Sequence, residues 1–155
     1  MVTTCVTTCA ACGQKNRLSP RHLPATGRCG RCKADLPALT TPLDVDTETL
    51  DEILRSSPIP VLVEFWAPWC QPCKIVAPEV ARVAREMAER ALVLKVDTDQ
   101  HPELAVRYNL AGIPHLSVFS GGEVLFEQFG AVRAAEMERW LEHAAAAAQV
   151  GASPT

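Results

Sequence analysis

Four cysteines near the N-terminus constrain the fold of this chain more than any other feature. They form two C-x₂-C pairs, Cys9–Cys12 and Cys29–Cys32, separated by 16 residues. This spacing is typical of structural zinc sites, because two thiolates on one tight turn can occupy two corners of a tetrahedron. Gly13 and Gly30 favour such turns. We therefore predict one structural Zn²⁺ per chain, with the ligands Cys9, Cys12, Cys29 and Cys32.

Other arrangements of these cysteines remain open at this stage. The four thiols could form two disulfides or lie in a disordered tail. No basic segment followed by an apolar core marks the N-terminus as a signal peptide, which disfavours disulfides. Cys5 precedes Cys9 by a C-x₃-C spacing, and we expect it to be free or weakly engaged. His22 lies between the pairs but is not expected to be a ligand.

The N-terminal segment differs in composition from the rest of the chain. Residues 1–36 carry six basic residues and one acidic residue, a formal charge of +5, with few large apolar side chains. A segment this small needs a metal, a disulfide or a partner to fold. Residues 37–155 carry 9 basic and 17 acidic residues, a formal charge of −8. We predict a zinc-binding domain at 1–36, a linker at 37–43 and a second domain at 44–150.

The second domain alternates between helix and strand patterns. Apolar residues at helical spacing predict helices at 47–55, 72–90, 102–108 and 137–148. Short apolar runs predict strands at 61–66, 92–96, 115–120 and 123–129, with a weak strand near 43–45. Gly121–Gly122 predicts a hairpin between the last two strands. The expected fold class is α/β, a mixed central sheet with helices on both faces and a small zinc-ribbon-like domain at the N-terminus.

A third C-x₂-C pair lies where a predicted strand passes into a long helix. Cys70 would stand at the N-terminus of that helix, where unpaired N–H groups and the helix dipole lower a thiol pKa. Cys73 lies one turn later and can close a disulfide ring with Cys70, and Pro72 suits the first helical turn. The pair could instead be half of a second zinc site, but no further cysteine follows Cys73. The pattern favours thiol–disulfide exchange.

Several segments resemble the thioredoxin family. The active-site segment of that family is similar to residues 65–74, FWAPWCQPCK, and its third strand is similar to Lys95–Asp97. Gly112–Pro114 matches its cis-proline segment and Gly130 its glycine after the last strand. The resemblance covers residues 40–148. Together with the Cys₄ segment, the chain resembles the thioredoxin-2 type.

This resemblance implies a protein-disulfide reductase with a defined set of site residues. Cys70 would attack a substrate disulfide and Cys73 would resolve it. A cis Ile113–Pro114 bond would face these cysteines, and the surface that binds substrate would comprise Trp69, Gln71, Pro72, Ile113 and Pro114. The implied partners are disulfide-containing substrate proteins and an NADPH-dependent thioredoxin reductase. No bound organic cofactor is expected, because the chain lacks a dinucleotide-binding glycine fingerprint.

Three positions depart from the family pattern. Glu64 stands where the family usually has a buried aspartate, and in an apolar strand its pKa should be raised. It would assist Cys73 as a base, with Lys95 as its charge partner; alternatively, Glu64 lies at a sheet edge, paired with Lys95. Gln71 replaces a glycine, so the redox potential can differ. His115 replaces a threonine and could make activity pH-sensitive or lie at the solvent edge.

Charge and hydropathy indicate which classes of binding partner and which cellular compartment to expect. The chain has a formal charge of −3, and residues 1–36 contain no aromatic side chain for stacking on bases, so nucleic acid is not an expected partner. No run of 18 apolar residues suggests a membrane-spanning helix. We expect a cytoplasmic protein. An alternative function is an oxidative-stress sensor or holdase in which oxidation of the four N-terminal cysteines releases zinc.

Overall fold

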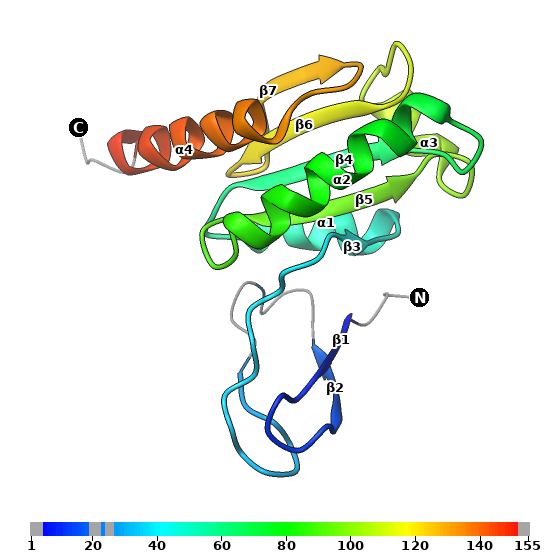
Figure 1. The fold of residues 1–155 in the computed structure, drawn as a ribbon. Helices are drawn as coiled ribbons and strands as arrows, with labels where there is room; N and C mark the ends of the chain where they lie inside the picture. Colours follow the sequence, from blue (N-terminus) through cyan, green and yellow to red (C-terminus); the bar gives the residue numbers. More distant parts are fainter. Residues whose placement is uncertain (1–4, 19–22, 24–26, 152–155) are drawn as a thin grey trace.

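A five-stranded mixed sheet forms the centre of the larger part of the molecule (Figure 1). The computed structural model describes residues 5–18, 23 and 27–151. The strands are β3 (Leu43–Asp44), β4 (Val61–Trp66), β5 (Leu92–Asp97), β6 (His115–Ser120) and β7 (Glu123–Phe129), in the order β3-β5-β4-β6-β7. β3, β5 and β4 are parallel, whereas β6 and β7 are antiparallel to their neighbours. The predicted mixed sheet is thereby confirmed.

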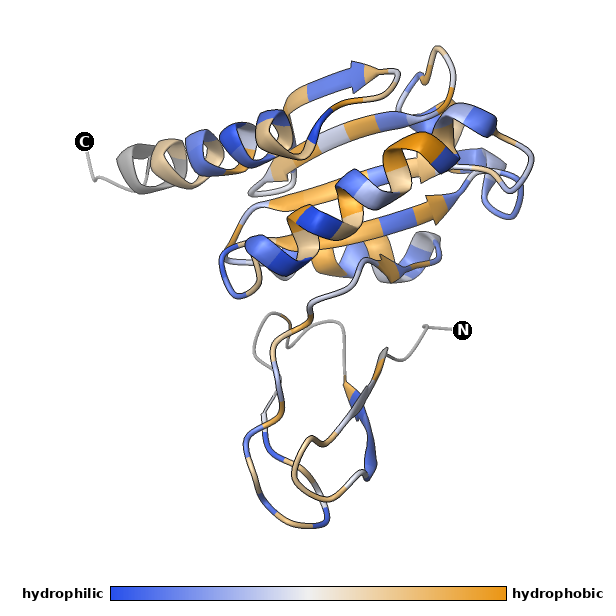
Figure 2. Cartoon of the chain, in the orientation of Figure 1, coloured by the Kyte–Doolittle hydropathy of each residue, from blue (hydrophilic) through white to orange (hydrophobic). Residues whose placement is uncertain are grey.

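Helices cover both faces of this sheet, as predicted. α2 (Gln71–Glu86) and α4 (Ala134–Gly151) lie on one face, where Val80, Met137 and Leu141 are buried against strand residues such as Val118. α1 (Thr47–Ser56) and α3 (Pro102–Arg107) cover the other face with buried Leu50 and Leu104. Figure 2 shows mainly orange strands β4 and β5 in the middle of the sheet, beside helices with mixed blue and orange bands. The apolar stripe of each helix therefore faces the sheet.

Two helix boundaries differ from the sequence prediction. α2 ends at Glu86 rather than Arg90, because Glu89 adopts a left-handed φ of 72° and the chain reverses there. The N–H groups of Arg90 and Ala91 both bond to the carbonyl of Met87 in this turn. α4 begins at Ala134, three residues earlier than its apolar spacing indicated, since Glu79 accepts a hydrogen bond from the Ala134 N–H. A backbone turn thus sets the end of α2, and a contact between residues distant in sequence sets the start of α4.

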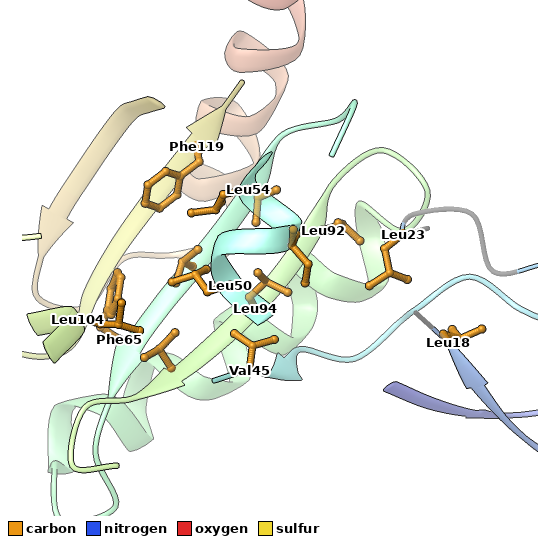
Figure 3. Packing of buried hydrophobic residues seen from close by; sticks show 14 of the residues in the cluster. Leu18, Leu23, Val45, Leu50, Leu54, Phe65, Leu92, Leu94, Leu104 and Phe119 are labelled. Carbon is orange, nitrogen blue, oxygen red and sulfur yellow. The ribbon is translucent and has the colours of Figure 1, made fainter. Parts of the chain in front are cut away.

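The N-terminal part contains a hairpin that the sequence did not reveal. β1 (Cys5–Thr8) pairs antiparallel with β2 (Lys15–Leu18). Leu18, Leu23 and Leu36 are buried and belong to the same apolar cluster as residues of α1 and β5 (Figure 3). Figure 3 shows Leu23 on the side of the cluster where Leu92 lies. The cysteine-rich part therefore packs against the α/β part through a few leucines.

None of the helices in the described part of the chain is long and apolar enough to cross a membrane.

Candidate functional site

Cys70 and Cys73 lie together at the N-terminus of α2, as the sequence predicted. They form a disulfide with a Cα–Cα distance of 5.3 Å. Cys70 is the N-cap of α2, and its Sγ accepts a hydrogen bond from the Cys73 N–H at 3.2 Å. Pro72 and Gln71 occupy the exposed first turn. A thiolate at Cys70 would be stabilised by the same N–H group and by the helix dipole, so the elbow favours Cys70 as a nucleophile.

Aromatic and apolar groups surround this pair. Trp69 is 66% exposed, and its indole N–H donates to the Asp99 carboxylate at about 3.0 Å. Ile113 packs against Cys70 and Cys73, and the Ile113–Pro114 peptide bond is cis. The carbonyl of Pro114 accepts a hydrogen bond from Gly130 at 2.8 Å. The structure thus places Ile113 against the redox pair, with the cis-bonded Pro114 next to it in the chain and Trp69 directly before Cys70.

Glu64 is buried in the middle of the sheet. Its strand β4 lies between β5 and β6, and the residue is only 1% exposed. Burial raises the pKa of Glu64 to about 7; the positive charge of Lys95 lowers it, and Asp44 raises it further. The alternative of a Glu64 at a sheet edge is wrong, because both edges of β4 are paired. Its carboxyl group can therefore exchange a proton near neutral pH.

A small cavity connects Glu64 with the redox pair. It has a volume of about 110 Å³ and is lined by residues that include Glu64, Trp66, Cys73 and Lys95. Glu64 Oε1 has no hydrogen-bond partner among the described residues. The Lys95 Nζ lies 4.4 Å from the centroid of the Trp66 ring. The cavity has room for water, which can relay a proton between Glu64 and Cys73.

The raised pKa of Glu64 predicts a pH-dependent stability. Because the folded-state pKa of about 7 exceeds the ordinary 4.5, the native state binds this proton more tightly than the unfolded chain. Stability should fall as the pH rises from about 4.5 to 7 and then level off. We expect Glu64→Gln to be more stable than the wild type by about 3 kcal/mol at pH 8 and equally stable at pH 4. Urea unfolding at both pH values measures this.

Glu123→Gln is the matched control, since Glu123 is exposed on β7. A stability gain for Glu64→Gln that stays constant from pH 4 to pH 8 would contradict the predicted linkage.

His115 lies inside the protein and not at the solvent edge. It follows Pro114 directly, is 7% exposed and faces the Phe65 ring at 6.0 Å between ring centroids. Its Nε2 lies 3.4 Å from a carboxylate oxygen of Glu127 on β7. The solvent-edge alternative is therefore wrong, because β6 is an interior strand at this point.

The four N-terminal cysteines converge in the structure. Their Sγ atoms all lie within 4.8 Å of one another. Cys9 and Cys32 are 3.6 Å apart, and Cys12 and Cys29 are 3.7 Å apart. Tetrahedral coordination with Zn–S bonds of about 2.3 Å requires S···S distances of about 3.8 Å, so the sulfurs fit such a metal. His22 lies outside the described residues, as does the side chain of Cys5.

Two similar turns hold these sulfurs. Cys9 N–H bonds to the carbonyl of Gln14, and Cys29 N–H bonds to the carbonyl of Ala34. Gly13 has a φ of 79°, as expected, but in the second turn Lys33 takes the left-handed conformation with a φ of 66°. Gly30 is thus not needed for its conformation, contrary to the sequence prediction. Its N–H instead donates to the side chain of Asn16 at 2.9 Å.

Hydrogen bonds to the buried Cys29 sulfur favour its thiolate form. The backbone N–H of Cys32 lowers the pKa of Cys29 to about 6, and the Arg31 N–H and the Asn16 side chain add to this, whereas burial raises it. Metals bind the thiolate form of cysteine. The turn around Cys29 therefore favours the protonation state that a metal requires.

Comparison with known proteins agrees with this geometry. The thioredoxin family model matches residues 41–143. The chain belongs to the thioredoxin family. A relative from Corynebacterium nephridii, thioredoxin C-3, is 34% identical over 134 residues, which cover 86% of this chain and 91% of that protein. Thioredoxin 1 from Chlorobaculum tepidum is 44% identical over 92 residues, 59% of this chain and 91% of that protein.

Solved structures show the same fold. A mutant thioredoxin from Halobacterium salinarum is 30% identical, with a TM-score of 0.64, covering 70% of this chain and 95% of that one. Chloroplastic thioredoxin z is 28% identical, with a TM-score of 0.63, covering 68% and 96% of the two chains. The match to thioredoxin C-3 spans more residues than lie between 41 and the C-terminus. It therefore extends into the cysteine-rich part.

As a member of the thioredoxin family, the chain is a thiol–disulfide oxidoreductase whose redox-active disulfide is Cys70–Cys73. Sequence reasoning missed two neighbours of this centre. Asp99 holds the Trp69 indole; its position after the carboxyl end of a parallel strand was the available signal. Phe129, 55% exposed, lies over Gly112, where a Cβ atom would approach the ring to 2.8 Å. No local sequence pattern indicated that contact.

Proposed function

We propose that this thioredoxin reduces disulfide bonds in proteins by a two-step exchange. The Cys70 thiolate attacks one sulfur of the substrate disulfide, forms a mixed disulfide and releases the first substrate thiolate. The Cys73 thiolate then attacks Cys70 Sγ and releases the second. Two electrons pass to the substrate, and the protein is left with the Cys70–Cys73 disulfide. The observation that supports this most directly is the N-cap position of Cys70, bonded to the Cys73 N–H.

Glu64 and Lys95 would serve the second step. Cys73 must lose a proton before it attacks, and the cavity it shares with Glu64 offers a path through water. A carboxyl group with a pKa of about 7 is matched to accept that proton at neutral pH. Lys95 would act as a positioning residue, since its charge lowers the pKa of Glu64.

The substrate would bind across the exposed surface around Cys70. Trp69 offers a large exposed ring that Asp99 holds in place. Gln71 and Pro72 form the exposed turn between the cysteines, while Ile113 packs against the disulfide. Pro114 would position the substrate backbone next to Cys70. Together these residues would form one apolar surface for the substrate, with polar groups at its edge.

The N-terminal part would be a structural zinc domain. The sulfur distances and the donor set of four cysteines support Zn²⁺ as the resident metal. Bound Zn²⁺ would supply the cross-link that residues 1–36 need, since they have few apolar side chains to bury. The zinc domain would comprise residues 1–36, the linker residues 37–43 and the α/β domain residues 44–150. We propose no bound organic cofactor.

A zinc-linked oxidation sensor or holdase is a second candidate. It is favoured by Cys12 and Cys32, which are exposed although their partners Cys9 and Cys29 are buried. An oxidant could reach one thiolate of each pair. Zinc release under peroxide, followed with a chromogenic chelator and an aggregation assay, distinguishes this role from a passive structural one.

The redox cycle requires a reductant and a reducing compartment. Thioredoxin reductase, with NADPH, would return the Cys70–Cys73 disulfide to the dithiol. We propose the cytoplasm as the location, because zinc-bound thiolates persist where thiols are kept reduced.

Stopped-flow reduction of insulin tests the function and the role of Glu64 together. Reduced wild-type protein should show an attack phase and a resolution phase. In Glu64→Ala we expect resolution to slow by about 10-fold near pH 7 while attack changes little, because proton transfer from Cys73 loses its base. Absence of any reduction by the wild type would contradict the proposed function. Equal resolution rates in both proteins would remove Glu64 from the mechanism alone.

A further inference from the structure

A second, larger groove lies on the other side of α2. It has a volume of about 530 Å³ and runs between α2 and residues 131–133, which lead into α4. Its floor is apolar, with Val76 and Val132 both buried. Its rim includes Ile75, whose 69% exposure is high for a large apolar residue. The redox chemistry described above does not use this groove.

The groove is continuous with the surface around the redox pair. Ile75 lies two residues after Cys73 on α2. Ala131, on the opposite wall, follows Gly130, whose N–H bonds to the carbonyl of Pro114. Both walls of the groove therefore follow, in the chain, residues that lie next to the redox pair or bond to Pro114.

Three charged side chains line the groove, and two of them are already engaged. Glu79 accepts a hydrogen bond from the Ala134 N–H at 3.0 Å. Arg82 is paired with Glu86 at 2.8 Å, and the Glu138 carboxyl group lies close to that pair. Arg133 has no ion pair or side-chain hydrogen bond within the described part of the chain, and it is exposed. Glu79 keeps its negative charge in the hydrogen bond from the Ala134 N–H, so Arg133 is the positive charge at this groove that is open to a substrate carboxylate.

We propose that this groove binds a segment of the substrate protein in which an apolar side chain is followed by a carboxylate. The apolar side chain would lie on the floor beside Ile75, and the carboxylate would bind the guanidinium of Arg133. A guanidinium can bind a carboxylate through two parallel hydrogen bonds, which gives direction as well as attraction. Arg133 is thus a specificity-determining residue for the exchange reaction. This inference rests on the proposed function.

Three synthetic peptides test the preference. Each has the same length and one intramolecular disulfide, flanked by leucine and then by two residues of Glu, Gln or Lys. We expect the wild type to reduce the Glu peptide with a kcat/KM about two- to fivefold higher than the Gln peptide, and the Lys peptide more slowly still. Arg133→Gln should remove the difference and Arg133→Glu should reverse it.

Arg55→Glu is the matched control. Arg55 is exposed in the last turn of α1, on the other face of the sheet, and the variant makes the same change in charge. It should keep the wild-type order of the three peptides. The proposed binding by the groove would be contradicted if the wild type reduced all three peptides equally. It would also be contradicted if Arg55→Glu shifted the order as Arg133→Glu does. Either result would leave the exchange reaction intact. Failure to reduce any peptide would contradict the proposed function itself.

Discussion

Replacing Cys70 by serine is expected to abolish disulfide reduction, lowering the rate by about 10³-fold or more. The hydroxyl of serine is not ionised at neutral pH, so the N–H group and helix dipole at the start of α2 have no anion to stabilise. Cys73 is not expected to replace it as the nucleophile, because it lies inside the first turn of α2 and not at the N-cap. The measurement is NADPH oxidation in the presence of insulin and thioredoxin reductase.

Two further variants make this result specific. Cys73→Ser should also lose turnover, but it should accumulate a mixed disulfide between Cys70 and the substrate that non-reducing electrophoresis detects. Cys5→Ser removes a cysteine outside the three C-x₂-C pairs and should leave turnover unchanged. Substantial activity in Cys70→Ser, or a trapped mixed disulfide in that variant, would contradict the assignment of Cys70 as the attacking cysteine.

The redox centre was predictable because its residues belong to consecutive elements of the chain. A strand that ends near Trp66, a turn and a helix that begins after Cys70 are all visible in the hydropathy pattern. The apolar neighbours Val63 and Phe65 indicated a buried Glu64, but only the pairing of β4 on both sides excluded the sheet-edge alternative. Such features are local in the sequence, so a pattern of a few residues is enough to locate them.

Features that depend on contacts distant in sequence were not predictable. The burial of His115 requires β4 beside β6, and the bond between Trp69 and Asp99 joins residues 30 positions apart. The β1–β2 hairpin has mostly polar residues, so its strands lack the alternation that marks a half-buried strand. The turn at Cys9, which a metal would hold, defines the hairpin instead. The four ligands could therefore be predicted from the sequence, whereas the hairpin could not.

Loss of one zinc ligand is expected to unfold the N-terminal part while the redox centre survives. Cys29 is fully buried and lies in the apolar cluster with Leu18, Leu23 and Leu36. Structural Zn²⁺ contributes about 10–16 kcal/mol in small domains, far more than these few leucines can supply by burial. Cys29→Ser should therefore reduce the zinc content from one ion per chain to near zero. Metal analysis and hydrogen exchange of residues 5–18 and 27–36 measure the effect.

Insulin reduction should remain close to that of the wild type in Cys29→Ser, because Cys70, Cys73 and Glu64 are held by β4 and α2. Arg31→Ser is a matched control: it changes an exposed residue of the same turn and keeps all four ligands. A full complement of zinc in Cys29→Ser would contradict the ligand assignment. Loss of insulin reduction in a variant whose α/β domain remains folded would show that the metal acts on the redox centre.

The α/β domain should nevertheless lose some stability when zinc is lost. Leu23 belongs to the same apolar cluster as Leu92 and Leu54, so unfolding of the N-terminal part exposes apolar surface on α1 and β5 (Figure 3). A loss of about 1 kcal/mol would lower the Tm of a domain this size by about 4–8 °C. Leu23→Ser should lower the Tm by a similar amount while zinc stays bound. An unchanged Tm in both variants would mean that the two domains are energetically independent.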